Sequence, residues 1–108
     1  MAFIHKDLAA GKWQKLSLAE QMGNIGGEVL RALRHQKDER LFRGAIERVL
    51  ELFDLTLSDS RWKGRYREIA RAREVFCDAV YGGKLYGSSL NDLIPYFDNF
   101  ALAARKSC

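Results

Sequence analysis

Apolar residues recur at intervals of three and four along most of this chain, and no segment shows the sustained period-two alternation of a half-buried strand. The pattern predicts an all-α protein. It returns in four stretches separated by short polar or glycine-containing breaks, and such helices are typical of an antiparallel up-down four-helix bundle. We expect the bundle domain over residues 17–108 and an N-terminal arm over residues 1–16, whose apolar Phe3, Ile4 and Trp13 suggest docking on another surface.

Local signals mark the helix ends. Ser17 and Glu20 have the spacing of a capping box, which predicts the start of the first helix. A second helix is expected over residues 38–57, and a third ends at Gly82-Gly83. Pro95 lacks a backbone N–H, so we expect it either to start or to kink the fourth helix. The stripes that we expect to face the core include Leu41 in the second helix and Trp62 and Tyr66 in the third.

Length and composition narrow the class of protein. A chain of 108 residues can bury a single core that needs neither metal nor disulfide. Cys77 and Cys108 fit a reducing compartment, and with the two histidines they form no cluster with metal-ligand spacing, so we expect no metal and no cofactor. No apolar run approaches the ~18–20 residues of a membrane span, and the first residues lack a signal-peptide core. These features predict a cytoplasmic protein without a membrane partner.

Positive charge is concentrated in one stretch. Residues 61–73 hold six basic residues and one acid, a net charge of +5, whereas the whole chain carries +4. Such a stripe is the electrostatic footprint expected for the phosphates of RNA or DNA. Lys63, Arg67 and Arg71 repeat at i, i+4 opposite the apolar stripe, which favours phosphate contacts; the alternative is a solvated face. The candidate nucleic-acid-binding residues are Arg61, Lys63, Arg65, Arg67 and Arg71.

A row of small residues lies on the first helix, about 120–140° from its apolar stripe. Glycine inside a helix costs roughly 0.8–1 kcal/mol relative to alanine, so close approach of another backbone should compensate for it. Either a neighbouring helix of the same bundle or a second subunit would meet this row. We favour a second subunit, because the apolar stripe already faces the core. The candidate interface residues are Ala19, Gly23, Gly26, Gly27 and Leu30.

Arg73 falls within the apolar sector of the third helix, where a solvated guanidinium is not expected. Burying this group requires a carboxylate or several carbonyl oxygens. We expect either a buried ion pair with Glu20, Glu28 or Glu51 or a side chain that reaches solvent at the end of the bundle. A ligand-facing arginine is the alternative.

The sequence carries no pattern that indicates catalysis. No Ser/His/Asp or Cys/His arrangement is supported by spacing, and no glycine-rich phosphate loop joins a strand to a helix. Arg31 and His35 are separated by only three residues, a shorter gap than in the helical ribonucleases of the HEPN type. We therefore predict that the protein is not an enzyme. The acidic residues expected to be solvating charges, paired with Arg40, Arg43 and Arg48, are Asp38, Glu39, Glu47 and Glu51.

Several segments of the chain resemble a group of small bacterial helical proteins. They are Trp-Gln-Lys-Leu-Ser-Leu-Ala-Glu-Gln-Met-Gly-Asn-Ile-Gly-Gly-Glu-Val at residues 13–29, Leu-Phe-Asp-Leu-Thr-Leu at 52–57, Arg-Ala-Arg-Glu-Val-Phe-Cys-Asp at 71–78, Tyr-Phe at 96–97 and Phe-Ala-Leu-Ala-Ala-Arg at 100–105. The chain is similar over these segments to the four-helix-bundle superfamily of the 23S ribosomal RNA intervening-sequence protein and the accessory variability determinant (Avd) of diversity-generating retroelements.

This resemblance implies a basic bundle that assembles into a ring-like homo-oligomer, a pentamer. It also implies binding to nucleic acid and to the reverse transcriptase of the retroelement, in support of mutagenic reverse transcription. The net charge of +4 is lower than expected for a strongly RNA-binding member. The competing hypothesis is a helical module that binds only proteins, with its charge serving solubility.

Overall fold

The computed structural model describes residues 11–85, 87 and 89–106, and within this part the chain is all-α, with four α-helices and no strand. The prediction of an all-α chain with four helices is therefore confirmed. Phe3 and Ile4 of the expected arm, and Cys108, lie outside the described residues. The elements are η2 (Trp13–Lys15), α1 (Leu18–Arg34), α2 (Glu39–Leu57), η3 (Ser60–Arg65), α3 (Tyr66–Val80) and α4 (Leu90–Lys106), where η denotes a 3₁₀-helix.

The predicted capping signals act as expected. The Ser17 hydroxyl accepts from the backbone N–H of Glu20 at 3.1 Å, and the Glu20 carboxylate accepts from the backbone N–H of Ser17 at 2.9 Å. Gly82 and Gly83 follow α3 with positive φ angles of 106° and 74°, a conformation that glycine adopts without strain. Pro95 does not start α4, because this helix begins at Leu90 and continues through the proline.

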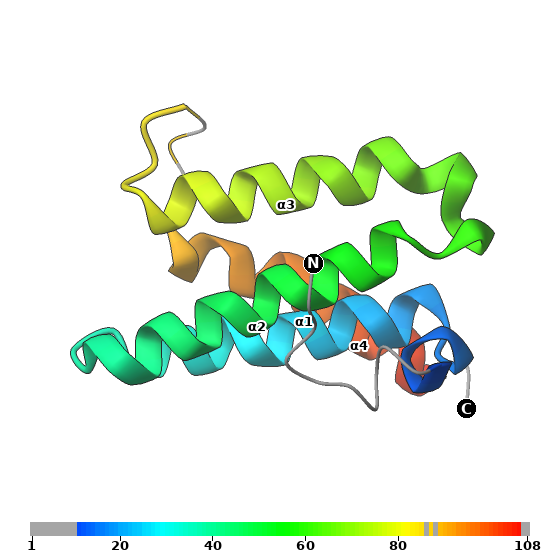
Figure 1. Cartoon of the computed structure of the whole chain (residues 1–108), viewed down its shortest axis with the longest axis horizontal. Helices are drawn as coiled ribbons and strands as arrows, with labels where there is room; N and C mark the ends of the chain where they lie inside the picture. The colour runs from blue at the N-terminus through cyan, green and yellow to red at the C-terminus, as the bar shows by residue number, and fades with distance from the viewer. Residues whose placement is uncertain (1–10, 86, 88, 107–108) are drawn as a thin grey trace.

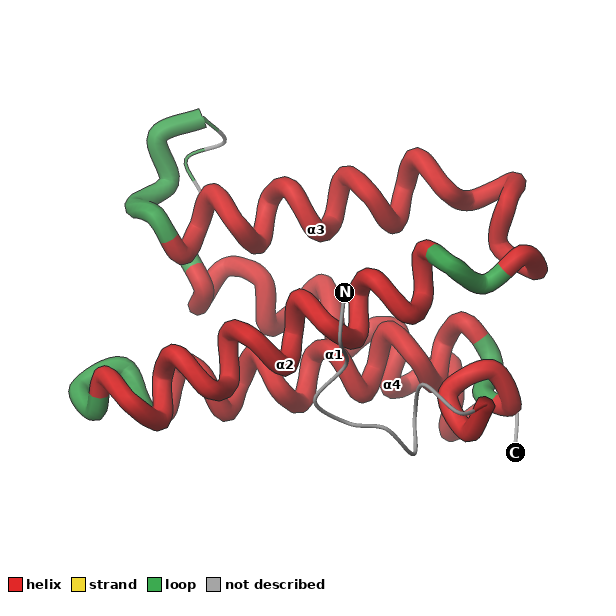
Figure 2. The backbone as a smooth tube through the Cα atoms, in the orientation of Figure 1, coloured by secondary structure: helices red, strands yellow, loops and turns green. Residues whose placement is uncertain are grey.

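Helix α1 makes its most extensive contacts with α4 and α2, whereas α3 lies against α2 and touches α4 less. The α1–α2 turn and the α3–α4 connection lie at one end of the molecule, and η3 joins α2 to α3 at the other end (Figures 1 and 2). The Cα radius of gyration is 13.5 Å, close to the ~13 Å expected for one compact domain of this length.

Phe53 of α2 lies at the centre of the core. Its ring centroid is 6.2 Å from that of Phe76 in α3 and 6.3 Å from that of Phe97 in α4, so one aromatic side chain connects three helices. Leu41 and Tyr66 were assigned to the core by the apolar stripes, but about half of each is exposed. The buried apolar cluster is Trp13, Leu18, Met22, Ile25, Val29, Val49, Leu52, Phe53, Leu55, Ile69, Ala72, Phe76, Leu90, Leu93 and Phe97.

The core begins before Ser17. Trp13 is almost fully buried, and its indole Nε1 donates to the Thr56 hydroxyl at 3.0 Å. The part of the predicted arm that the structure describes, Gly11–Leu16, is therefore attached to the end of α2 in the same chain. The exposed tryptophan that the sequence suggested for docking elsewhere is a core residue instead.

Candidate nucleic-acid interface

The five basic residues proposed to contact phosphates are all exposed, but they do not lie on one helix. Arg61, Lys63 and Arg65 belong to η3, whereas Arg67 and Arg71 belong to α3. Trp62 (φ −102°, ψ 18°) and Arg65 (φ −118°, ψ 12°) depart from helical geometry. The expected continuous i, i+4 row is therefore wrong at its first member, because Lys63 precedes the start of α3.

Arg61 is held in place by its own chain. Its guanidinium Nη2 donates to Asp59 Oδ2 at 2.7 Å and to the backbone carbonyl of Leu16 at 2.7 Å, and Nε donates to Asp59 Oδ1 at 3.0 Å. The guanidinium carbon also lies 4.4 Å from the Trp62 ring centroid. Hydrogen bonds from Arg61 hold the pKa of Asp59 below its ordinary 3.8. Arg61 therefore joins η3 to the residue that precedes Ser17, the N-cap of α1. Its charge is already neutralised by the buried carboxylate of Asp59.

The remaining four basic residues differ in their partners. Arg65 forms a two-pronged pair with Glu68, with Nη2 at 2.8 Å from Oε2 and Nε at 3.0 Å from the same oxygen. In the described part of the chain, Lys63 and Arg67 are exposed and form no ion pair. Arg71 is exposed and lies at the edge of a groove between α3 and α4. Lys63 and Arg67 are therefore the cations best placed for an external anion, whereas Arg71, although exposed, already has an interaction within the chain.

A buried polar network holds η3 against the bundle and so determines where the exposed cations lie on the surface. Gln21 of α1 is fully buried; its amide Nε2 donates to the carbonyl of Trp13 at 2.9 Å, and its Oε1 accepts from Trp62 Nε1 at 2.8 Å. The same amide lies 3.4 Å from Asp59 Oδ2. Gln21 therefore joins η2, α1 and η3 with its donor and acceptor both satisfied. No sequence pattern indicated this role, because a glutamine in the first turns of a helix normally faces solvent.

Arg73 forms the ion pair that the sequence predicted, but with a different partner and with less burial. Its Nε lies 3.1 Å from Oδ1 of Asp54 in α2, not from any of the three glutamates expected. About a third of the arginine side chain and a quarter of the aspartate side chain are exposed. The pair therefore links α3 to α2 at the margin of the core rather than within it.

The small residues of the row on α1 differ in their surroundings. Gly26 is buried against Phe97 of α4, so this position is filled by a neighbouring helix of the same chain. At exposed Gly27 a β-carbon would meet nothing within 4 Å. Ala19, Gly23 and Leu30 are partly buried. A neighbouring helix of the same chain therefore meets this row at Gly26, whereas the position at Gly27 is open.

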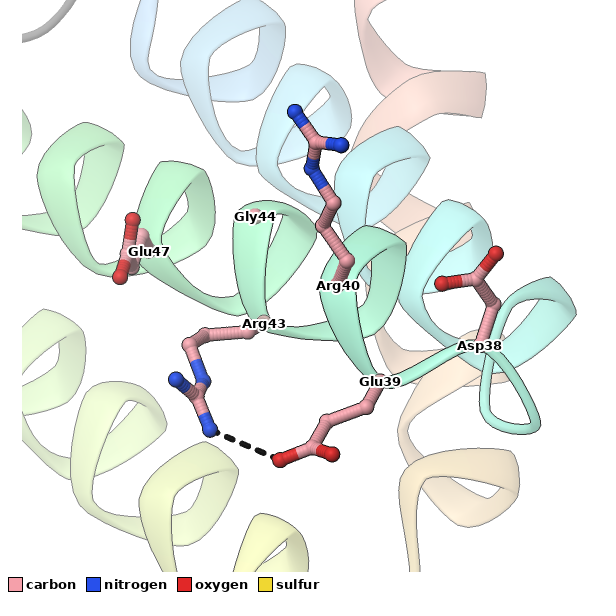
Figure 3. A pocket seen from close by; sticks show the side chains of 6 residues that line it. All are labelled: Asp38, Glu39, Arg40, Arg43, Gly44 and Glu47. Carbon is pink, nitrogen blue, oxygen red and sulfur yellow. Dashed lines mark hydrogen bonds and ion pairs between the residues drawn. The ribbon is translucent and has the colours of Figure 1, made fainter.

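The charged hollow at the start of α2 does not assemble a catalytic group. Figure 3 shows Arg43 pointing to Glu39, an ion pair of 2.9 Å, while Arg40 and Glu47 point elsewhere. The carboxylate of Asp38 caps α2 by accepting from the backbone N–H of Leu41 at 3.2 Å. These side chains do not converge on one point in Figure 3.

Two expectations for α2 are revised. Arg48 pairs with Glu28 of α1 at 3.3 Å, a partner outside its own helix. Glu51, expected to be a solvating charge, is buried. Among the described residues, no group of three or more His, Cys, Asp and Glu side chains is arranged to hold a metal ion.

Comparisons of the chain with protein-family models, with curated proteins and with solved structures give no match. Within the described part of the chain, none of the helices is both long enough and apolar enough to cross a bilayer.

Proposed function

We propose that this protein is a non-enzymatic accessory protein of a diversity-generating retroelement. In this proposal the chain is an antiparallel up-down four-helix bundle that assembles into a homo-oligomer, a pentamer, in the cytoplasm. It binds RNA or DNA and a reverse transcriptase, as the sequence resemblance implies. The observation that carries the nucleic-acid part is that Lys63 and Arg67 are exposed and form no ion pair among the described residues, whereas Arg61 and Arg65 pair with carboxylates of the same chain. Arg71 is exposed one turn further along α3.

Exposed cations of this kind bind phosphates without reading bases. Each bound phosphate releases a counterion from the nucleic acid, so affinity falls with salt and depends little on sequence. The buried network around Gln21 fixes η3 to the bundle, which keeps Lys63 close to the first turn of α3. The expected behaviour is therefore salt-sensitive binding with weak sequence preference.

The decisive experiment replaces Lys63, Arg67 and Arg71 together by glutamine and measures binding to RNA and DNA over a range of salt concentrations. The slope of log affinity against log salt should flatten by roughly 0.7–0.9 for each phosphate that the variant no longer neutralises. A matched control replaces Arg34, Lys37 and Arg40, which are exposed at the α1–α2 turn. The control removes the same charge at the opposite end of α2 from η3, and this helix of 19 residues is about 28 Å long.

Equal losses of affinity in the two triple variants would show that only net charge matters and would contradict a site at η3 and α3. Unchanged affinity in the first triple variant would contradict nucleic-acid binding by this surface. Circular dichroism should show full helical content in both variants, because exposed substitutions usually change stability by no more than about 0.5 kcal/mol per site.

The assembly part of the proposal is tested at Gly27. A glutamine at this position fits the monomer, since nothing lies within 4 Å of the added β-carbon, so a loss of association would locate the interface there. Light scattering of the unmodified protein should give a mass several times that of one chain. Co-elution with a reverse transcriptase encoded beside its gene would support the partner, and a monomer at micromolar concentration would contradict the assembly.

A module that binds only proteins is the second candidate. Two large apolar side chains near the end of α3 favour it, because Tyr81 is 79% exposed and Leu85 is 83% exposed. Single exposed apolar residues are ordinary, but Tyr81 and Leu85 together border one hollow at the end of α3, separate from the hollow at the start of α2. Salt-insensitive behaviour together with a loss of partner binding in Tyr81→Ser would favour this candidate over nucleic-acid binding.

A further inference from the structure

A groove of about 290 Å³ lies between α3 and α4, where these two helices touch less than the other neighbouring pairs. Its floor is apolar and includes Val75 of α3 and Leu93 and Phe97 of α4. The two α4 residues are buried beneath it, so the floor belongs to the packed core. The groove is therefore a fixed depression in the bundle rather than a gap between loose side chains.

Three polar groups border this apolar floor. Tyr96 of α4 is 36% exposed and lines the groove together with Arg71 and Glu68 of α3. The Tyr96 ring meets the ring of Phe100 nearly at a right angle, with centroids 5.4 Å apart, which restrains its orientation. Burial, and secondarily the charge of Glu68, raises the pKa of the Tyr96 hydroxyl above its ordinary 10.0, so the hydroxyl is protonated at neutral pH.

We propose that this groove receives one unpaired nucleobase of a single-stranded nucleic acid whose phosphates lie along Arg67 and Arg71. The inference rests on the proposed nucleic-acid-binding function and specifies its substrate class. Arg71 belongs both to the exposed cations and to the lining of the groove, so a phosphate held by Arg71 places its own base beside Tyr96.

The size and charge of the groove favour a base over a partner helix. A volume of about 290 Å³ lies at the lower end of small-molecule sites and suits one flat ring system with a few polar atoms. A helix docked in a groove instead presents apolar anchors over two turns and needs a longer trough. In the neighbouring stretch, Lys63 and Arg67 are exposed and form no ion pair among the described residues, so they can complement a polyanion.

The unmodified full chain provides the first test, by fluorescence anisotropy with a labelled single strand of about 12 nucleotides and its matched duplex. A duplex has the higher charge density, so cations alone would favour it. Tighter binding to the single strand is the result expected for a base in the groove. Tighter binding to the duplex, whose bases are paired and cannot enter, would overturn the inference.

Two variants then test the groove itself. Tyr96→Leu removes the aromatic ring but keeps an apolar side chain, and Val75→Trp fills the groove from a partly buried position. Tyr96→Leu should lower single-strand affinity by between about 5-fold and 150-fold, the range for removal of one base–aromatic stack. Val75→Trp should lower it because the base can no longer enter the groove. Duplex affinity should not change, because the phosphate-binding cations are untouched. Tyr81→Leu is the matched control, since it makes the same substitution outside the groove and should leave both affinities unchanged.

The outcomes separate this inference from the proposed function. Full single-strand affinity in both groove variants, together with weaker binding by the Lys63, Arg67 and Arg71 variant, would overturn the groove and retain the phosphate-binding surface. No binding of either nucleic acid by the unmodified protein would overturn both. Circular dichroism of each variant shows whether the helices have formed. The preference of the unmodified chain for single-stranded over double-stranded nucleic acid tests the groove without any variant.

Discussion

Gly26 of α1 lies directly against Phe97 of α4, so that a β-carbon at residue 26 would overlap the phenylalanine side chain and lie only 3.0 Å from its Cγ. The missing side chain is what allows these two helices to approach, and α1 and α4 share the most extensive contact in the fold. It also lets the Phe97 ring reach Phe53 of α2, 6.3 Å away between centroids. A glycine that weakens α1 locally is therefore compensated by packing within the same chain.

Gly26→Ala should destabilise the protein, whereas Gly27→Ala should not. The clash at residue 26 involves atoms close to the α4 backbone, and overpacking of this kind costs about 1–3 kcal/mol, more than the roughly 0.8–1 kcal/mol gained in helix propensity. Gly27 faces open space, so alanine there should be neutral or stabilising by up to about 1 kcal/mol. Urea unfolding followed by circular dichroism measures both. Equal stability of the two variants would contradict the close approach of α1 and α4.

Gln21→Met keeps the size of the side chain and removes its hydrogen bonds. The Trp13 carbonyl and the Trp62 indole N–H then lose their partner, and an unsatisfied buried group costs about 1–3 kcal/mol. We expect the free energy of unfolding to fall by about that amount, which is roughly 4–8 °C in melting temperature for each kcal/mol. Gln36→Met, at an exposed position in the α1–α2 turn, is the control and should change little. A stable Gln21→Met variant would show that the network is dispensable.

Asp59 should make stability depend on acid pH. Its folded-state pKa is held below the ordinary 3.8 by hydrogen bonds from Arg61, so its contribution is complete above the unfolded pKa and is lost as pH falls through the folded pKa. Asp59→Asn should therefore lower the free energy of unfolding by roughly 1–2 kcal/mol at pH 7. The difference from the unmodified protein should narrow below about pH 4. Denaturant titrations at several pH values measure this, and a difference that is independent of pH would refute it.

The Arg73–Asp54 pair should contribute little. Both side chains are partly exposed, and exposed ion pairs are typically worth about 0.2–1 kcal/mol because water screens the attraction. A double-mutant cycle with Arg73→Met and Asp54→Asn should give a coupling energy in that range. A coupling of several kcal/mol would instead indicate the buried pair that the sequence suggested.

Some features of the fold could be predicted from local sequence because they depend on local chemistry. The apolar periodicity located all four helices, and the capping box at Ser17 and the glycines after α3 marked their ends correctly. Met22, Ile25 and Val29, spaced three and four residues apart, form the buried side of α1, as helical periodicity requires. The same reasoning failed at Leu41 and Tyr66, which are about half exposed. Periodicity predicts which residues lie on the same face of a helix, but it does not predict whether a neighbouring helix is long enough to cover the whole face.

Local sequence was enough to set the helices, their caps and the excess of positive charge over residues 61–73, because each follows from residues within a few positions of one another. The long-range partners of the polar side chains were decided by the packing of the helices. This packing brought Asp54 rather than a glutamate to Arg73, placed the Leu16 carbonyl beside Arg61 and buried Gln21 between two tryptophans. The physical reason is that hydrogen bonds and ion pairs act over about 3 Å, so they depend on the relative rotation and offset of whole helices, which core packing around Phe53 sets.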